Sequence, residues 1–211
     1  MADVKGPSDF VDAAYHLEGE GMEDFYRRWA ADYDHEMLDK LGYTSPSSIA
    51  GFLIEHLPDT HAEILDLGCG TGLTCRLLAE KGYDRLDGID ISREMLQVAR
   101  ERGIYRDLLA GDLNESLDRE SRSYDGVISS GTFTHGHVGP EPLDEVFRIL
   151  RPGGILACTV HMDLWETKGF KARFADLEND GVASLVDRTE GAYYRDGPIE
   201  GWFCVYRKTP G

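Results

Sequence analysis

Short apolar runs alternate with amphipathic segments along most of the chain from Glu63 onward. The apolar runs are typical of buried strands, whereas the segments between them repeat their apolar residues at helical spacing. Alternation of this kind indicates βα units wound into a parallel sheet. The expected strands lie at 63–68, 84–90, 105–112, 123–131 and 155–162, and the expected helices at 73–82, 92–103 and 141–154.

Residues that start and stop helices agree with these boundaries. Ser92 stands where an N-cap would precede the segment REMLQVAR. Gly82, Gly103 and the sequence RPGG at 151–154 follow helical patterns and are expected to end them.

The two ends of the chain differ from this repeating middle. Residues 22–42 and 45–57 are predicted to form two helices, and residues 167–181 a single amphipathic helix. Residues 183–195 and 200–208 then predict two strands joined across Asp-Gly-Pro, which makes an antiparallel pair. The expected fold class is α/β: a Rossmann-like doubly wound sheet, mostly parallel with an antiparallel C-terminal strand, and with helices on both faces.

Length and charge narrow the classes of protein. The 211 residues favour one structural domain, with N-terminal helices in residues 1–60 and the sheet in residues 61–211. A net charge of -17 disfavours nucleic acid and anionic membrane as partners. The N-terminus lacks the apolar run of a signal peptide and no stretch is long enough for a membrane span, so we expect a cytoplasmic monomer or homodimer. The four cysteines form no metal-ligand pattern, and no metal is expected.

The stretch ILDLGCGTGL, residues 64–73, carries the candidate chemistry. Its glycines Gly68, Gly70 and Gly72 allow the chain to turn sharply after the first strand of the sheet. Their spacing is G-x-G-x-G, whereas a dinucleotide fingerprint has G-x-G-x-x-G. Asp66 stands just before the loop, where a carboxylate would repel phosphate and attract an ammonium or sulfonium, although it could also cap loop amides.

Asp90 ends the second strand, 22 residues after Gly68. From this position a carboxylate can accept hydrogen bonds from both hydroxyls of a ribose. The G-x-G-x-G spacing, the carboxylate of Asp66 and the carboxylate of Asp90 together indicate a nucleoside ligand that has a ribose and a positive charge but no phosphates.

The segments DLGCGTG, GIDIS and LRPGG resemble the Rossmann-like S-adenosylmethionine-dependent methyltransferases, over roughly residues 25–160. The resemblance implies that Asp66, Gly68 and Gly70 contact the methionine part of the cofactor and that Asp90 holds the ribose. Cys69 and Gly72 complete the cofactor loop, with Cys69 as a small loop residue. Ile91 would pack on the adenine, Asp112 would meet its amino group beside Leu113, and Ser129 and Ser130 would lie under the sulfonium.

Two further groups of residues follow from the same resemblance. The segment FYRRWAADYD resembles a segment that folds over the cofactor as a lid, which would recruit Tyr26, Trp29 and Tyr33, although helical spacing alone fits aromatic core equally well. His135 follows the fourth strand and is the candidate general base, with His137 and His161 as weaker candidates.

The expected function is therefore methyl transfer from S-adenosylmethionine, with S-adenosylhomocysteine as product, to the oxygen, nitrogen or sulfur of a small molecule. The alternative is a non-catalytic protein that binds the same cofactor as a sensor or partner subunit. An NAD-dependent oxidoreductase is disfavoured by Asp66 and by Leu73, which stands where the nucleotide fingerprint continues. The aromatic residues Trp165, Tyr193, Tyr194 and Trp202 could border a substrate, but we expect sheet core.

Overall fold

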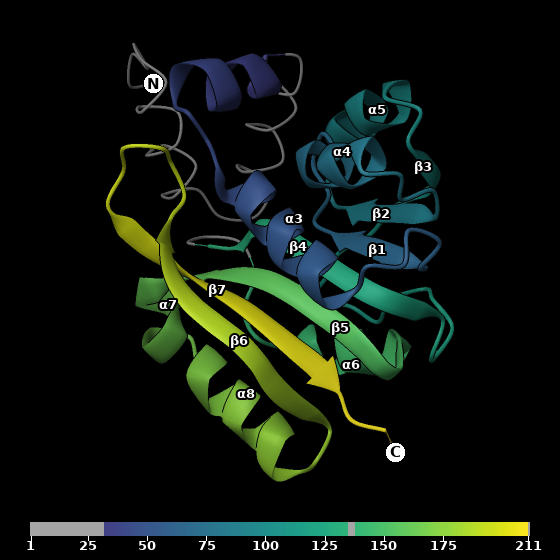
Figure 1. Ribbon diagram of the computed structural model, residues 1–211, viewed down its shortest axis with the longest axis vertical. Helices are drawn as coiled ribbons and strands as arrows, with labels where there is room; N and C mark the ends of the chain where they lie inside the picture. Colours follow the sequence, from purple (N-terminus) through teal and green to yellow (C-terminus); the bar gives the residue numbers. More distant parts are fainter. Residues whose placement is uncertain (1–31, 135–137, 211) are drawn as a thin grey trace.

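A seven-stranded sheet forms the centre of the computed structural model, which describes residues 32–134 and 138–210 (Figure 1). Its strands lie in the order β3-β2-β1-β4-β5-β7-β6. Neighbours among β1 to β5 pair in parallel, and β7 pairs antiparallel with β5 and with β6, as predicted. The strands are β1 (Ile64–Leu67), β2 (Leu86–Asp90), β3 (Tyr105–Ala110), β4 (Tyr124–Phe133), β5 (Leu150–His161), β6 (Ala183–Ala192) and β7 (Ile199–Lys208).

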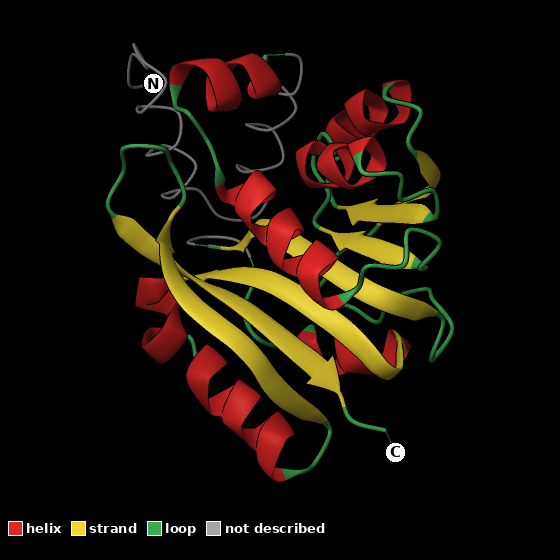
Figure 2. Ribbon diagram, viewed as in Figure 1, coloured by secondary structure: helices red, strands yellow, loops and turns green. Residues whose placement is uncertain are grey.

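Helices cover both faces of the sheet (Figure 2). Side chains of β1 show why: Ile64 packs in one core with α3 and α4, whereas Leu65 and Leu67 pack in a second core with α6, α7 and α8. Alternate residues of a strand point to opposite faces, so a strand that is buried along its whole length, as β1 is, needs a cover on each face. The helical elements are η1 (His35–Lys40, a π-helix), α3 (Ser45–His56), α4 (Leu73–Glu80), α5 (Arg93–Glu101), α6 (Leu143–Ile149), α7 (Met162–Thr167) and α8 (Phe170–Asn179).

The predicted helix boundaries hold in the middle of the chain. Ser92 caps α5 by accepting a hydrogen bond from the amide of Met95 at 3.2 Å. Gly82 and Gly103 follow α4 and α5 with φ of 93° and 66°, the left-handed conformation that ends a helix. The predicted start of α5 and the predicted ends of α4 and α5 are therefore confirmed.

Two expectations are corrected. The single helix expected over residues 167–181 is wrong, because Gly169 adopts φ 85° and separates α7 from α8. The helix expected over residues 141–154, with RPGG at its end, already ends at Ile149. The RPGG segment lies within β5, which pairs regularly with β4 only from Ile155 onward. Residues 22–31 of the helix predicted over residues 22–42 lie outside the described residues, and the described remainder contains η1. Among the described helices none is long and apolar enough to cross a membrane.

The strand order reverses direction between β1 and β4. From β1 the chain passes through α4 to β2 on one side, whereas β4 pairs with the other side of β1. Loops that leave β1 and β4 therefore diverge at the carboxyl edge of the sheet, which is where open α/β sheets bind ligands.

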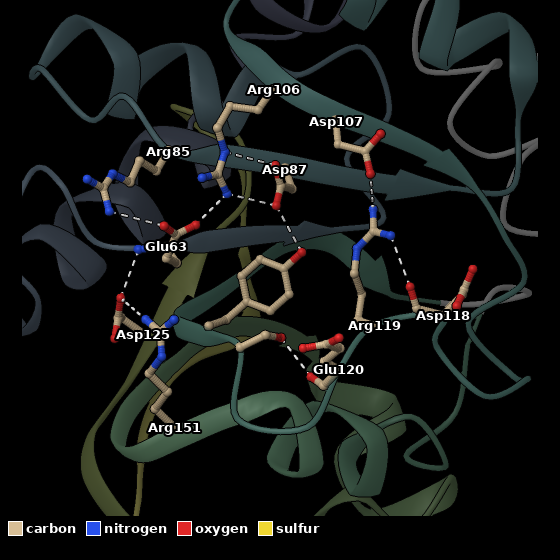
Figure 3. A network of polar contacts seen from close by, with 12 residues as sticks. Glu63, Arg85, Asp87, Arg106, Asp107, Asp118, Arg119, Glu120, Asp125 and Arg151 are labelled. Carbon is tan, nitrogen blue, oxygen red and sulfur yellow. Dashed lines mark hydrogen bonds and ion pairs between the residues drawn. The ribbon is translucent and has the colours of Figure 1, made fainter.

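The amino edge of the sheet carries a network of charged residues (Figure 3). Arg106 at the start of β3 pairs with Glu63 before β1 at 2.5 Å and with Asp87 of β2 at 2.9 Å. The Arg106 guanidinium lowers the pKa of Glu63. Tyr124, the first residue of β4, donates its hydroxyl to Asp87 at 3.0 Å. Four parallel strands are thus tied together at the edge opposite the expected ligand site.

Replacement of Asp87 tests whether this network stabilises the fold. Asp87→Ala leaves the hydroxyl of Tyr124, which is 3% exposed, without its acceptor. We expect the free energy of unfolding in urea to fall by about 1 to 3 kcal/mol. The matched control is Asp107→Ala, whose carboxylate is 60% exposed in its pair with Arg119. That substitution is expected to cost less than about 1 kcal/mol, and equal losses in the two variants would contradict the prediction.

Candidate functional site

The loop between β1 and α4 bends as the glycine pattern predicts. Gly68, Gly70 and Gly72 have φ of 72°, 53° and 88°, so all three adopt the left-handed conformation. Residues with a Cβ rarely occupy this region, which is why the loop needs glycine at alternate positions.

The three glycines face different surroundings. A Cβ on Gly68 would lie 2.2 Å from the hydroxyl oxygen of Thr132, and one on Gly72 would lie 2.9 Å from the ring of Tyr105. A Cβ on Gly70 would meet nothing within 4 Å among the described residues. The outer two glycines thus serve close packing, and Gly70 faces the open side of the loop.

The amides of the loop are already engaged by protein acceptors. Gly68 and Cys69 both donate to the carbonyl oxygen of Ile89, at 2.9 and 3.0 Å, and Gly72 donates to the carbonyl of Cys69 at 2.8 Å. Gly70 donates to the Oδ2 of Asp90 at 2.8 Å. A phosphate-binding loop presents such amides to its ligand. This loop does not, which agrees with the predicted preference for a ligand without phosphates.

Asp66 lies beneath the loop and is 1% exposed. Its Oδ2 accepts a hydrogen bond from the hydroxyl of Tyr105 at 2.8 Å, and its buried Oδ1 has no hydrogen-bond partner in the described part of the chain. Burial raises the pKa of Asp66 to about 6, against the opposing effect of the Tyr105 hydrogen bond. The thiol and backbone amide of Cys75, in the first turn of α4, also lower the pKa of Asp66. The amides of Gly68, Cys69, Gly70 and Gly72 donate to other acceptors, so Asp66 does not cap them.

The end of β2 presents a carboxylate beside an apolar side chain. Asp90 accepts the amide of Gly70 on Oδ2 and the amide of Ser92 on Oδ1, at 2.8 and 2.9 Å. Each carboxylate oxygen has a second lone pair, so two further hydrogen bonds can be accepted. Burial raises the pKa of Asp90. Ile91, which follows, is 50% exposed although it is apolar, and it therefore offers a surface for a flat aromatic ring.

Asp112 follows β3 in a local turn. Its Oδ1 accepts both the backbone amide and the side-chain amide of Asn114, at 2.9 and 2.8 Å. Leu113 is buried in the core on the α6 side of the sheet. The turn chemistry considered for Asp112 is therefore present, and Leu113 supports the turn from below.

The end of β4 is fastened to the end of β1. Ser129 is fully buried, and its hydroxyl donates to the carbonyl of Leu67 at 2.7 Å, as does Thr132 at 3.0 Å. The side chain of Ser129 is thus engaged within the sheet rather than directed at a ligand. Ser130 lies next to it, with its hydroxyl 3.0 Å from that of Ser45 and 3.5 Å from that of Tyr43.

The structure describes only some of the remaining predicted site residues. Tyr26, Trp29, His135 and His137 lie outside the described residues. Tyr33 is partly buried. His161 is 8% exposed at the end of β5, where its ring accepts the amide of Asp163.

The C-terminal aromatic residues form core, as expected. Trp165 and Tyr193 are buried, and the rings of Trp165 and Trp202 lie 5.7 Å apart. The guanidinium of Arg188 lies 5.1 Å from each of these two ring centroids. Tyr194 packs against Tyr43 at 5.4 Å.

Sequence reasoning missed the residues that support the loop from distant parts of the chain. Tyr105 on Asp66 and Thr132 against Gly68 come from β3 and β4. Asp34 accepts the hydroxyl of Thr71 and pairs with Arg102. These supporting residues belong to no local motif. Only Tyr105, at the start of the strand beside β2, could have been suggested by an argument from sheet topology.

The described residues contain no cluster of three or more His, Cys, Asp or Glu suited to a metal ion. Cys69, Cys75, Cys158 and Cys204 are free and buried. Burial raises the pKa of each of these thiols, which keeps them protonated.

Comparison with known proteins agrees with this geometry. The family described as "Methyltransferase domain" matches residues 64–154, from β1 into β5. Methyltransferase-like protein 27 of Homo sapiens is 35% identical over 175 residues, which are 78% of this chain and 71% of that protein. Two other relatives are matched over less than half their length. They are the 18S rRNA (guanine-N(7))-methyltransferase RID2 of Arabidopsis thaliana (47% identity, 31% of this chain, 22% of that protein) and the demethylmenaquinone methyltransferase of Symbiobacterium thermophilum (36%, 45% and 41%).

Solved structures with the same fold are more distant in sequence. A Haloferax volcanii protein in complex with the Trm112 methyltransferase activator superposes with a TM-score of 0.65 at 23% identity, covering 87% of this chain and 97% of that one. The [4+2]-cyclase SpnF superposes with a TM-score of 0.62 at 19% identity, covering 78% and 82%. These likenesses establish the fold.

The sheet order and the glycine loop at its switch point define a protein with a Rossmann-like fold. The family match and the human relative make the class definite: the chain belongs to the class I S-adenosylmethionine-dependent methyltransferases. S-adenosylmethionine is the methyl donor that this family and fold imply. The free oxygen of Asp66, the open face of Gly70 and the exposed Ile91 fit such a molecule.

The raised pKa of Asp66 predicts a pH-dependent effect of Asp66→Asn on stability. Because the folded-state pKa of about 6 exceeds the unfolded value, the wild-type loses stability as pH rises from about 4 to about 6. The asparagine variant, whose amide oxygen can still accept from Tyr105, avoids this penalty. In chemical unfolding it should be more stable than wild-type at pH 7.5, by roughly 2 to 3 kcal/mol, and similar at pH 4. A difference between the proteins that does not change with pH would contradict the assignment.

Proposed function

We propose that the carboxyl edge between β1, β2 and β4 binds S-adenosylmethionine, with the roles that the family resemblance implies. Asp66, Gly68 and Gly70 contact the methionine part, Cys69 and Gly72 complete the loop, and Asp90 accepts from the ribose. Ile91 packs on the adenine, and Asp112 meets its amino group above Leu113. Ser130 borders the sulfonium through its side chain and Ser129 through its backbone, since the Ser129 hydroxyl is bonded to Leu67.

The observation that carries this proposal is the free, buried oxygen of Asp66 beside the open face of Gly70. Burial of an ionised carboxylate costs desolvation free energy. A cationic ligand offsets this cost, whereas a diphosphate increases it. The loop amides support the same ligand class, because those of Gly68, Cys69, Gly70 and Gly72 already donate to protein acceptors and are not presented to a phosphate.

Within residues 1–60, we propose that the part before α3 acts as a lid that brings Tyr26, Trp29 and Tyr33 over the donor, on the same structural domain as residues 61–211, since α3 itself packs in the sheet core. When bound, the donor supplies an activated methyl group whose leaving group is a neutral thioether. The chain's contribution is mainly orientation, which in enzymes can be worth about 7 to 11 kcal/mol. His135 is proposed as general base for acceptors that are poorly ionised at neutral pH.

The proposed acceptor is a small molecule methylated on oxygen, nitrogen or sulfur, and not a nucleic acid. A net charge of -17 and the scattered placement of the 22 Lys and Arg residues support this proposal. The Arabidopsis relative is named for methylation of rRNA, so RNA is the alternative acceptor to test. The segments FYRRWAADYD, ILDLGCGTGL, GIDIS and MLQVARERGIY together resemble the methyltransferase-like protein of the Williams-Beuren syndrome region, and on them we propose that finer affiliation.

Ligand-dependent thermal unfolding tests the donor site. S-adenosylmethionine and S-adenosylhomocysteine should raise the midpoint, with a stabilisation of about 2.7 kcal/mol at a hundredfold excess over Kd, while NAD should not. Asp90→Ala should abolish most of the shift, since two hydrogen bonds of about 1 to 3 kcal/mol each are lost to the ribose. Asp107→Ala, on the exposed surface of β3, is the control that should shift like wild-type. An unchanged midpoint with both adenosyl compounds would refute the proposed site.

Transfer of label from methyl-labelled donor tests the acceptor. The purified protein is incubated with a small-molecule extract or with total RNA, and the acid-precipitable and soluble fractions are counted. We expect label to be transferred to soluble products only, because the negative surface repels polyphosphate. Label in RNA that depends on intact Asp90 would overturn the small-molecule proposal.

A further inference from the structure

Thr71 lies at the apex of the glycine loop, between two glycines in the left-handed conformation. It is 1% exposed, and both its side chain and its backbone carbonyl are held from outside the loop. The Thr71 hydroxyl donates to the Oδ1 of Asp34 at 2.6 Å, and the Nε of Arg102 donates to the Thr71 carbonyl at 2.5 Å.

Asp34 and Arg102 also bind each other through a salt bridge, so the three residues form a closed ring of polar contacts. The side chains of Arg102 and Asp34 are 17% and 32% exposed, which shields their interaction from solvent. Asp34 stands directly before η1, and Arg102 directly after α5. The ring therefore joins three parts of the chain at the loop's apex.

The absence of a side chain at Gly72 leaves space for the side chain of Arg102. A Cβ at Gly72 would lie 3.3 Å from the Cδ of Arg102, in addition to its conflict with the ring of Tyr105. The aliphatic part of Arg102 passes across the glycine before its guanidinium reaches the Thr71 carbonyl. Gly72 thus serves the approach of Arg102 as well as the turn itself.

We propose that Asp34 and Arg102 are positioning residues for methyl-donor binding, acting through Thr71. The ring holds the apex of the loop in the shape that keeps the Gly70 face open toward the donor, while neither residue needs to touch the donor. This inference rests on the donor site proposed above. It makes Thr71 and Arg102 energetically coupled with respect to donor affinity.

The experiment measures S-adenosylhomocysteine affinity by calorimetry for Thr71→Val, Arg102→Ala and the double variant. Each single change should weaken binding by about tenfold or more, because each removes a hydrogen bond or charge pair that holds the loop. The double variant should have nearly the same affinity as the single variant that binds more weakly, because loss of either contact already disrupts the closed set of contacts among Thr71, Asp34 and Arg102. Thr71→Ser keeps the hydroxyl and should bind within about twofold of wild-type.

The matched control is Arg151→Ala. Arg151 also pairs with an aspartate, Asp125 at 2.6 Å, but at the amino edge of the sheet. Its loss should leave affinity unchanged, and chemical unfolding of all variants separates lost stability from lost binding.

Each combination of results has a distinct meaning. Weak binding by the ring variants, rescued in Thr71→Ser and non-additive in the double variant, supports the inference. If Asp90→Ala binds weakly but the ring variants bind like wild-type, the inference fails and the donor site stands. If Asp90→Ala also binds like wild-type, the proposed donor site itself fails and the inference with it.

Discussion

The hydrogen bonds from the glycine loop to the end of β2 are the constraint on which the candidate site depends. Three successive amides, those of Gly68, Cys69 and Gly70, turn toward β2 and are accepted by the Ile89 carbonyl and the Asp90 carboxylate. Because β1 and β2 are parallel neighbours, these hydrogen bonds fix the position of the loop relative to Asp90, the proposed ribose acceptor. Asp90 therefore serves the loop's shape in addition to any ligand.

The carboxylates of Asp66, which is buried, and Asp90, which is partly buried, lie at the ends of β1 and β2, and desolvation raises the pKa of both. The ionised form of Asp66 lowers the stability of the free protein, and Asp90 raises the pKa of Asp66 further. Such strain is common where a site is prepared for a partner that is absent during folding. At the proposed donor site a cationic ligand would offset this cost, which would couple binding to folding through the same carboxylate.

Much of the fold follows from local patterns in the sequence. The left-handed glycines, the Ser92 cap and the positions of β1, β2 and β4 depend on short-range periodicity and on turn chemistry, and all are as predicted. The break at Gly169 was missed because amphipathic spacing continues across it. Local patterns could not predict the contacts of Tyr105 and Thr132 or those among Asp34, Thr71 and Arg102, since they join residues that are 31 to 68 positions apart.

The charged network of Figure 3 lies at the amino edge, away from the loops that leave the carboxyl edge. This separation has a consequence for evolution. Substitutions that reshape the ligand-facing loops leave the ties among the strands untouched, so a lineage can explore new acceptors without unfolding its scaffold. Enzymes named for rRNA and for demethylmenaquinone methylation share sequence with this chain, and a cyclase shares its fold. The ion-pair network at the amino edge holds the strands independently of the loops at the carboxyl edge, which can therefore diversify.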